Sequence, residues 1–209
     1  MLTSLPNLLT LSRIVMIPPV VVLLYLDTPL ARWIACALYA TACVTDYFDG
    51  YLARHWEQVS GLGRFLDPIA DKLLVAAVLL MLVANGTIVD LTILPALVIL
   101  CREILVSGLR EYLAEIRVPM PVSRLAKWKT MIQMIALGVL IVGDAGPAAL
   151  PVLDIGVIGL WIAALLTFIT GYDYLRRGLE HMLAERPEKP VPDKGPPSSG
   201  KAADGSPAP

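Results

Sequence analysis

The chain of 209 residues lacks the features of a disulfide-rich, zinc-binding, secreted, repetitive or nucleic-acid-binding protein. Its three cysteines lie in apolar stretches, at no spacing typical of a disulfide framework or a zinc site, so we expect them to be small core residues. They are Cys36, Cys43 and Cys101. No basic segment or small-residue cleavage site follows Met1, so no cleaved signal peptide is expected. No internal repeat is visible, and a net charge of −1 gives no indication of nucleic-acid binding.

Apolar residues are what the chain has in abundance. They make up 56% of it, and the mean hydropathy of +0.69 is well above that of a soluble domain. A helix needs about 20 apolar residues to span hydrocarbon. Such stretches, some short or broken by polar residues, occur at 14–26 with the residues before it, 31–48, 69–89, 88–109, 130–143 with the residues before it, and 149–169. We therefore predict an all-α integral membrane protein, a bundle of six transmembrane helices.

The last 24 residues differ in composition from the rest. Residues 186–209 are rich in proline, glycine, serine and alanine and show no apolar periodicity. Such a segment cannot bury enough surface to order itself. We predict one membrane domain over residues 1–185, followed by a disordered cytoplasmic tail over 186–209.

Basic residues are distributed unequally between the two predicted sides. With six spans both termini share a side, and the loops on the far side are 26–31, 85–91 and 143–154. Arg32 is the one basic residue of 17 that falls at that side. Because Lys and Arg concentrate on the cytoplasmic side of membrane proteins, we expect the near side and both termini to be cytoplasmic, in a bacterial inner membrane.

Four aspartates occur close together on the near side. Asp46 and Asp49 are three residues apart and Asp67 and Asp71 are four apart, so each pair can share one helix face. Clustered carboxylates near hydrocarbon are costly unless cations neutralise them. Few basic side chains are near, and carboxylate oxygens suit Mg²⁺ or Mn²⁺ better than zinc. The pattern predicts a divalent metal site; the simpler alternative is a solvated acidic loop with helix caps and salt bridges.

The spacing D-x₂-D-G-x₂-A-R-x₈-G-x₃-D-x₃-D over residues 46–71 resembles the signature of the CDP-alcohol phosphotransferase family, with every position present. Members are integral membrane enzymes that exchange CMP on a CDP-linked lipid or alcohol for a second alcohol. The resemblance extends over roughly residues 5–180 and implies that fold and reaction class. Because the family is commonly dimeric, the resemblance also suggests a homodimer, but the sequence itself gives no signal of an interface.

The resemblance implies roles for the aspartates. Asp46, Asp49 and Asp67 would bind metal, with Asp71 at the rim of a second metal site, so two ions are expected. Asp71 would also be the general base. Two metals bridging the phosphates would neutralise the charge on the transferring phosphoryl group, as in other two-metal sites.

Further positions match the part of the family that binds the CDP-diacylglycerol nucleotide. They are Gly50, Ala53, Arg54 and Ser60. There are independent physical reasons for three of them, because glycine and alanine let a nucleotide approach a helix and Arg54 offers a forked donor to phosphate.

The N-terminal segment P-N-L-L-T-L-S-R (6–13) resembles the family's short amphipathic entry helix, whose polar residues approach the nucleotide. Asn7, Thr10 and Arg13 are spaced three apart, hence near one helix face. The alternative is an interfacial helix with one arginine extended toward the headgroups.

A second set of basic residues indicates an acceptor with its own phosphate. Arg102 and Arg110 lie near one stripe of an apolar helix, and Lys127 and Lys129 begin the next span. A basic pocket from two helices suits a phosphate, whereas an ordinary cytoplasmic ring of Lys and Arg would explain Arg117, Arg124 and one lysine. The strings R-E-I-L-V-S-G-L-R-E-Y and K-W-K-T-M-I-Q-M look like those of the bacterial branch that uses sn-glycerol 3-phosphate.

The sequence thus predicts transfer of a phosphatidyl group from CDP-diacylglycerol to sn-glycerol 3-phosphate, giving phosphatidylglycerol phosphate and CMP. Alternatives with the same chemistry use serine, inositol phosphate or, as in a cardiolipin synthase, phosphatidylglycerol as the acceptor. A basic pocket argues against serine. A small cation transporter is disfavoured, because both aspartate pairs lie at one membrane boundary and transporter sites lie near the midplane.

Overall fold

A computed structural model describes the chain over residues 5–56, 61–116 and 124–183. Within these ranges the structure contains six α-helices, two short 3-10 helices and no strand. The α-helices are α1 (Leu5–Leu26), α2 (Pro29–Trp56), α3 (Gly61–Ala84), α4 (Ile93–Glu115), α5 (Arg124–Val142) and α6 (Val152–Leu183). The 3-10 helices are η1 (Asp90–Thr92) and η2 (Gly143–Ala145). The all-α class and the six helices are confirmed, and the predicted tail lies outside the described residues.

The first helix differs from the prediction. The sequence predicted a short amphipathic helix before the first span, but α1 is one helix from Leu5 to Leu26 and contains Pro18 and Pro19. Proline removes one backbone donor, and helices in apolar bundles tolerate that loss because neighbouring helices compensate. The polar N-terminal turns and the apolar span therefore belong to one continuous helix.

The loop between the third and fourth helices lies at the predicted 85–91, but the helix ends differ from the predicted apolar stretches. The apolar stretches 69–89 and 88–109 run together in the sequence, but α3 ends at Ala84 and α4 begins at Ile93. Gly86 has φ 75° and Asp90 has φ 48°, both in the left-handed region that stops an α-helix. The backbone thus turns within the predicted loop 85–91, whose polar residues 85–87 (N-G-T) the predicted stretch 69–89 had included.

Three helical segments are long and apolar enough to cross a membrane: Asp90–Glu115, Leu125–Ala145 and Val152–Arg176. The described residues contain three shorter apolar segments, Thr10–Leu26, Pro29–Thr45 and Lys72–Ala84. In the sequence, the aspartate motif lies in the last part of α2 and the first part of α3. The charged motif therefore occupies the ends of two helices whose remaining length is apolar.

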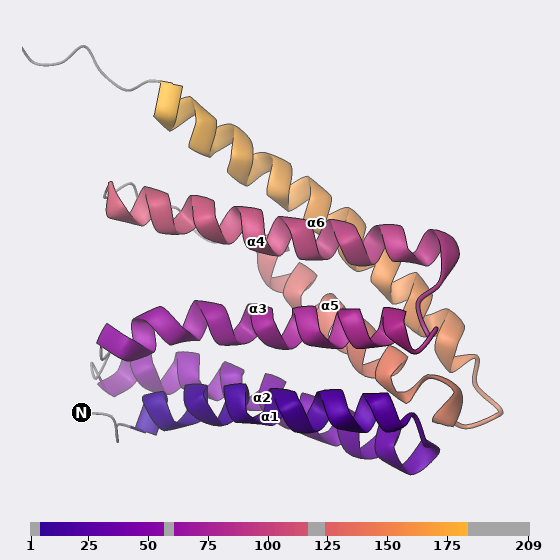
Figure 1. The fold of residues 1–209 in the computed structure, drawn as a ribbon. Helices are drawn as coiled ribbons and strands as arrows, with labels where there is room; N and C mark the ends of the chain where they lie inside the picture. The colour runs from indigo at the N-terminus through magenta and orange to yellow at the C-terminus, as the bar shows by residue number, and fades with distance from the viewer. Residues whose placement is uncertain (1–4, 57–60, 117–123, 184–209) are drawn as a thin grey trace, which may run out of the picture.

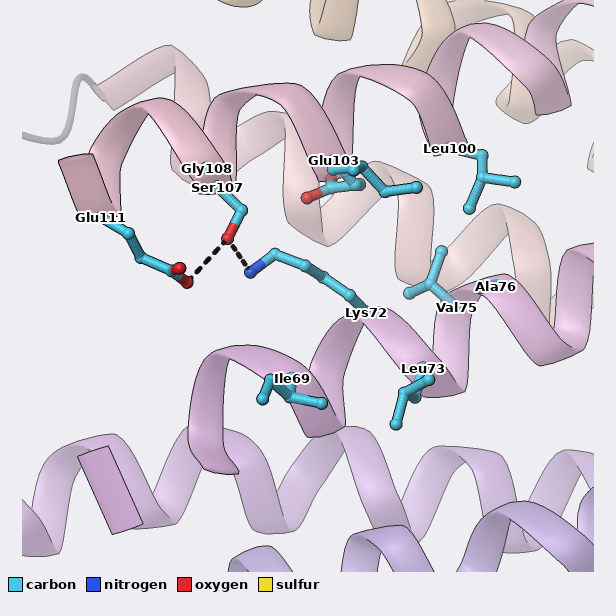
Figure 2. Close-up of a pocket in the computed structure, with 11 residues that line it drawn as sticks. Ile69, Lys72, Leu73, Val75, Ala76, Leu100, Glu103, Ser107, Gly108 and Glu111 are labelled. Atoms are coloured by element: carbon cyan, nitrogen blue, oxygen red, sulfur yellow. Dashed lines mark hydrogen bonds between the residues drawn. The ribbon is translucent and has the colours of Figure 1, made fainter. Parts of the chain in front are cut away.

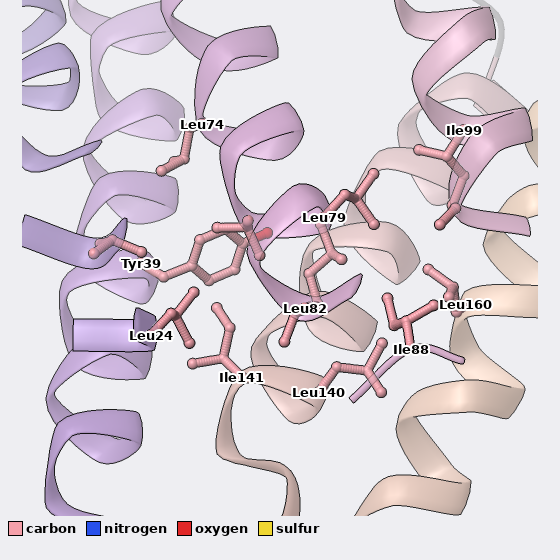
Figure 3. Packing of buried hydrophobic residues seen from close by; sticks show 14 of the residues in the cluster. Leu24, Tyr39, Leu74, Leu79, Leu82, Ile88, Ile99, Leu140, Ile141 and Leu160 are labelled. Carbon is pink, nitrogen blue, oxygen red and sulfur yellow. The ribbon is translucent and has the colours of Figure 1, made fainter. Parts of the chain in front are cut away.

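The apolar core lies where α1, α2 and α3 meet α5 and α6, and includes Leu24, Tyr39, Leu79, Leu140 and Leu160 (Figure 3). In the bundle α1 packs against α2 and α3, α5 against α2 and α6, and α4 against α6 (Figure 1).

Small residues set the spacing of α5 and α6. A Cβ on Gly156 would lie 2.7 Å from Leu140 Cδ2, and one on Gly159 would lie 2.9 Å from Ala136 Cβ. Helix pairs in membranes associate closely where one side chain is missing. The two glycines thus let α6 approach α5.

One buried arginine joins the loops at the end of the bundle away from the N-terminus. Arg32 Nε donates to Asp27 Oδ1 at 2.6 Å, and Arg32 Nη2 donates to Thr87 Oγ1 at 3.1 Å. A Cβ on Gly143 would lie 2.4 Å from Arg32 Nη1, so η2 also packs on this guanidinium. The three predicted far-side loops therefore meet at one end (Figure 1), and their one arginine is neutralised within the protein.

Candidate active site

The aspartates lie on two helices that are joined at one end of the bundle. Asp46 and Asp49 belong to α2 and Asp67 and Asp71 to α3, and only residues 57–60 separate these helices. The N-terminal turns of α1 lie at the same end (Figure 1). Each pair is helical, as predicted, so each has the one-face spacing. The aspartate side chains lie outside the described part of the structure.

The donor set fits a hard divalent cation by its chemistry, since four carboxylates are placed on the adjoining ends of two helices. Among the side chains that the structure describes, no group of three or more His, Cys, Asp or Glu could hold a metal. The four aspartates are therefore the candidate ligands, and the two-metal site stays a prediction.

Two of the three polar residues predicted on α1 are buried. Thr10 and Arg13 each expose 1% of their surface. An arginine extended toward lipid headgroups would be exposed, so the structure contradicts the interfacial alternative. Because α1 packs against both aspartate-bearing helices, Thr10 and Arg13 are enclosed at the motif end of the bundle.

The remaining predicted nucleotide-binding side chains lie outside the described residues. Gly50, Ala53 and Arg54 belong to α2 and Asn7 to α1, while Ser60 lies in the segment between α2 and α3. Their predicted roles stay predictions.

Two of the four predicted acceptor-binding residues meet at one carboxylate. Lys129 of α5 donates a hydrogen bond to Glu103 Oε1 of α4, and Arg102 Nη1 lies 4.0 Å from Glu103 Oε2. The Lys129 side chain is 2% exposed and that of Arg102 is 14% exposed. Two cations and one carboxylate thus form a largely buried cluster with a surplus positive charge, as a phosphate-binding site requires.

The last helix completes the surroundings of Arg102. Arg102 Nη2 donates to Thr170 Oγ1 at 3.2 Å, and its guanidinium carbon lies 5.7 Å from the centre of the Tyr174 ring. A Cβ on Gly171 would lie 2.9 Å from Arg102 Cγ, so this glycine leaves room for the side chain. Sequence reasoning missed the contribution of α6, although the spacing T-x₂-T-G-x₂-Y over 167–174 places these polar groups on one helix face.

The cluster has hydrogen-bonding capacity that the described residues do not use. Arg102 Nε, Gln133 Oε1 and Thr167 Oγ1 are buried and make no hydrogen bond within that part of the chain. Gln133 lies one turn after Lys129, and Thr167 one turn before Thr170. Buried polar groups are usually satisfied, so these atoms are available to a polar ligand or water.

The other two predicted acceptor-binding residues are exposed. Arg110 lies two turns beyond Arg102 on α4, and Lys127 lies in the first turn of α5. Because two residues along a helix amount to about 200° of rotation, Lys127 and Lys129 face opposite sides of α5. Neither side chain is part of the buried cluster, although the charge of Arg110 acts on Arg102, and their predicted roles stay predictions.

A cavity of about 350 Å³ opens between α3 and α4 (Figure 2), next to the aspartate-bearing part of α3 and to Glu103 of the cluster. Its walls are mostly apolar, and Glu103 is one of its polar lining residues. Lys72, which directly follows Asp71, donates a hydrogen bond to Ser107, and Ser107 Oγ donates to Glu111 Oε1 at 3.3 Å. The carboxylate that holds Lys129 thus shares a cavity with the helix that carries Asp67 and Asp71.

The chain matches known proteins over most of its length. Residues 3–169 match the CDP-alcohol phosphatidyltransferase family. The chain is 49% identical to a protein of Rickettsia bellii over 83% of this chain and 94% of that protein. It is 43% identical to one of Pectobacterium atrosepticum, over 86% and 97%. It is 40% identical to one of Cereibacter sphaeroides, over 88% and 99%.

These three relatives share the name CDP-diacylglycerol–glycerol-3-phosphate 3-phosphatidyltransferase. The matched region contains the paired aspartates of α2 and α3 and the cluster around Glu103. The chain belongs to the CDP-alcohol phosphatidyltransferase family.

Proposed function

We propose that the protein transfers the phosphatidyl group of CDP-diacylglycerol to sn-glycerol 3-phosphate, with phosphatidylglycerol phosphate and CMP as products. The observation that carries this proposal is the sequence identity of 40–49%, over most of the chain, to relatives named CDP-diacylglycerol–glycerol-3-phosphate 3-phosphatidyltransferase. The chain also contains the complete aspartate pattern. The cluster of Arg102 and Lys129 adds support, because a phosphorylated acceptor requires a buried positive site.

In the proposed reaction a hydroxyl oxygen of the acceptor forms a bond to the phosphorus that carries diacylglycerol. The bond from that phosphorus to the oxygen shared with CMP breaks, and CMP leaves with the electron pair. Asp71 takes the proton of the attacking hydroxyl, since a carboxylate within hydrogen-bond reach can do so as the new bond forms.

Asp46, Asp49, Asp67 and Asp71 would hold Mg²⁺ or Mn²⁺. A bound divalent metal supplies charge neutralisation on the pyrophosphate. Thr10 and Arg13 of α1, which are buried, would bind the nucleotide together with the predicted contacts from α2.

The acceptor's phosphate is proposed to bind at the cluster of Arg102 and Lys129. Lys129 donates a hydrogen bond to Glu103, and Arg102 lies 4.0 Å from the same carboxylate. Arg102 is also oriented by Thr170 and Tyr174. Arg110 and Lys127, which are exposed and lie outside the cluster, would add only long-range attraction for the anion. The cavity between α3 and α4 leaves open space between this cluster and the aspartate helix.

The proposed location is the bacterial inner membrane, with the site on the cytoplasmic side. The loops 26–31, 85–91 and 143–154 meet at the opposite end from the aspartates (Figure 1), and Arg32, the one arginine beside them, is ion-paired. The positive-inside rule then assigns the aspartate end to the cytoplasm, where a soluble phosphate ester is available.

The test is CMP release by the protein purified in detergent, with CDP-diacylglycerol and a panel of acceptors. We expect release with glycerol 3-phosphate and none with serine, inositol phosphate or phosphatidylglycerol. Activity with inositol phosphate but not with glycerol 3-phosphate would contradict the acceptor assignment. No CMP release with any acceptor would contradict the reaction itself.

A further inference from the structure

Glu103 is the carboxylate through which three helices make a single polar cluster. It belongs to α4, accepts a hydrogen bond from Lys129 of α5, and lies 4.0 Å from Arg102, which in turn contacts Thr170 of α6. The Glu103 side chain is 21% exposed and lines the cavity between α3 and α4. It is thus the part of the cluster that borders open space, and the lysine is behind it.

Because Lys129 is buried, its hydrogen bond to Glu103 determines how the ammonium group is oriented. At 2% exposure the side chain has almost no contact with solvent, and an isolated buried ammonium is costly. Lysine also carries a flexible four-carbon stem, so its charge has no fixed direction unless a partner provides one. Glu103 provides the partner and the direction toward the cavity.

Arg102 and Lys129 also repel each other, since the charge of the arginine acts on the lysine. The Glu103 carboxylate attracts both cations, so it keeps them closer together than their mutual repulsion would allow. Arg102 has two further contacts on α6, whereas Glu103 is the one ion-pair partner of Lys129 among the described residues. Loss of Glu103 therefore affects the lysine most.

We propose that Glu103 is a positioning residue for the acceptor: it holds Lys129 and Arg102 together as one receptor for the phosphate of the acceptor alcohol. This inference rests on the proposed function and deepens it. Glu103 acts through the two cations and takes no part in bond making or proton transfer.

The test measures Michaelis constants of three forms of the full-length protein in detergent. Glu103→Ala should raise the KM for glycerol 3-phosphate by about ten-fold or more, with the KM for CDP-diacylglycerol within about two-fold of wild type. Glu103→Gln should raise it less, because its amide oxygen still accepts a hydrogen bond from Lys129 but carries no charge. Equal KM values for glycerol 3-phosphate in all three forms would overturn the proposal, as would a parallel rise for both substrates.

Glu111→Gln is the matched control. Glu111 lies two turns beyond Glu103 on α4 and lines the same cavity, but its described hydrogen bond is to Ser107. The KM for glycerol 3-phosphate should stay within about two-fold of wild type. An increase as large as that for Glu103→Ala would mean that the loss of either carboxylate in the cavity has the same effect, which contradicts a specific role for Glu103.

A double-mutant cycle separates positioning from folding. If Glu103 acts through Lys129, adding Glu103→Gln to Lys129→Met should raise the KM little beyond the single Lys129→Met variant. The double variant leaves no unpaired buried charge from this pair, so it should fold even where Glu103→Ala does not. Fully multiplicative effects on KM would show that Glu103 does not act through Lys129.

The result is distinguishable from failure of the proposed function. If wild-type protein releases no CMP with glycerol 3-phosphate, the acceptor assignment is wrong and the role of Glu103 falls with it. If wild type is active and the Glu103 variants keep its KM for glycerol 3-phosphate, only the present inference is overturned.

Discussion

At the scale of single residues, Asp71 is the position where a small change should separate binding from chemistry. Asp71→Asn keeps the shape and one acceptor oxygen but cannot take a proton. We expect turnover to fall by roughly 10² to 10⁴, while CDP-diacylglycerol still binds when metal is present. Stopped assays of CMP release, together with a metal-dependent binding assay, measure both quantities. Loss of both would make Asp71 chiefly a metal ligand, and near-normal turnover would remove it from the mechanism.

The three other aspartates should behave differently from Asp71. Asp46→Ala, Asp49→Ala and Asp67→Ala should each abolish activity by loss of metal affinity. Because each substitution also relieves repulsion among carboxylates, the metal-free variants should be no less stable than wild type. Titration calorimetry with Mn²⁺ is the measurement. Unchanged affinity in all three variants would contradict the ligand assignment.

The two neighbouring lysines of α5 provide a matched pair. Lys129 is buried beside Glu103 and Lys127 is exposed. Lys129→Met should raise the KM for glycerol 3-phosphate by about ten- to a hundred-fold, the scale of one charge-assisted hydrogen bond. Lys127→Met should change it by less than about five-fold, the scale of a surface charge. The opposite order would mean that the acceptor binds on the exposed side of α5.

At the scale of helices, close packing of α5 and α6 supports the acceptor cluster, because Lys129 is on one and Thr170 and Tyr174 on the other. Gly156→Ala would place a Cβ 2.7 Å from two atoms of the Leu140 side chain and 3.3 Å from its backbone nitrogen. Leu140 is fully buried and cannot easily move, so we expect a loss of about 1–3 kcal/mol in stability. Thermal unfolding in detergent measures it.

Gly108→Ala is the control for this helix prediction. A Cβ on Gly108 of α4 would have no atom within 4 Å. Alanine is the better helix former by about 1 kcal/mol, so this variant should be as stable as wild type or slightly more so. Equal destabilisation by the two substitutions would indicate a backbone effect and not close packing of α5 on α6.

At the scale of the whole molecule, the orientation in the membrane can be tested with single cysteines. In a background with Cys36, Cys43 and Cys101 replaced by alanine, Asp144→Cys and Glu115→Cys place exposed thiols at opposite ends of the bundle. A membrane-impermeant maleimide should label residue 144 in intact bacteria, and residue 115 only after permeabilisation. The reverse pattern would place the aspartates outside the cytoplasm.

Much of the fold and the metal-site hypothesis could be predicted from local sequence. Apolar stretches of membrane length give the six helices, and the paired aspartates require only helical spacing to share a face. Helix ends were less predictable. The loop 85–91 was expected, but the predicted apolar stretches ran through it and past the observed helix ends. The residues before the first span continue into α1, because turns and proline-containing helices depend on backbone geometry and neighbours.

The sequence by itself determined the class, the family and the residues available for chemistry. The tertiary structure decided which of the basic residues meet. Arg102 and Lys129 are 27 residues apart, and Arg102 and Thr170 are 68 apart; such contacts depend on how each helix is rotated against its neighbours. Lys129 faces inward and Lys127 outward because α5 turns by about 100° per residue, and only packing against α4 and α6 determines which face is buried.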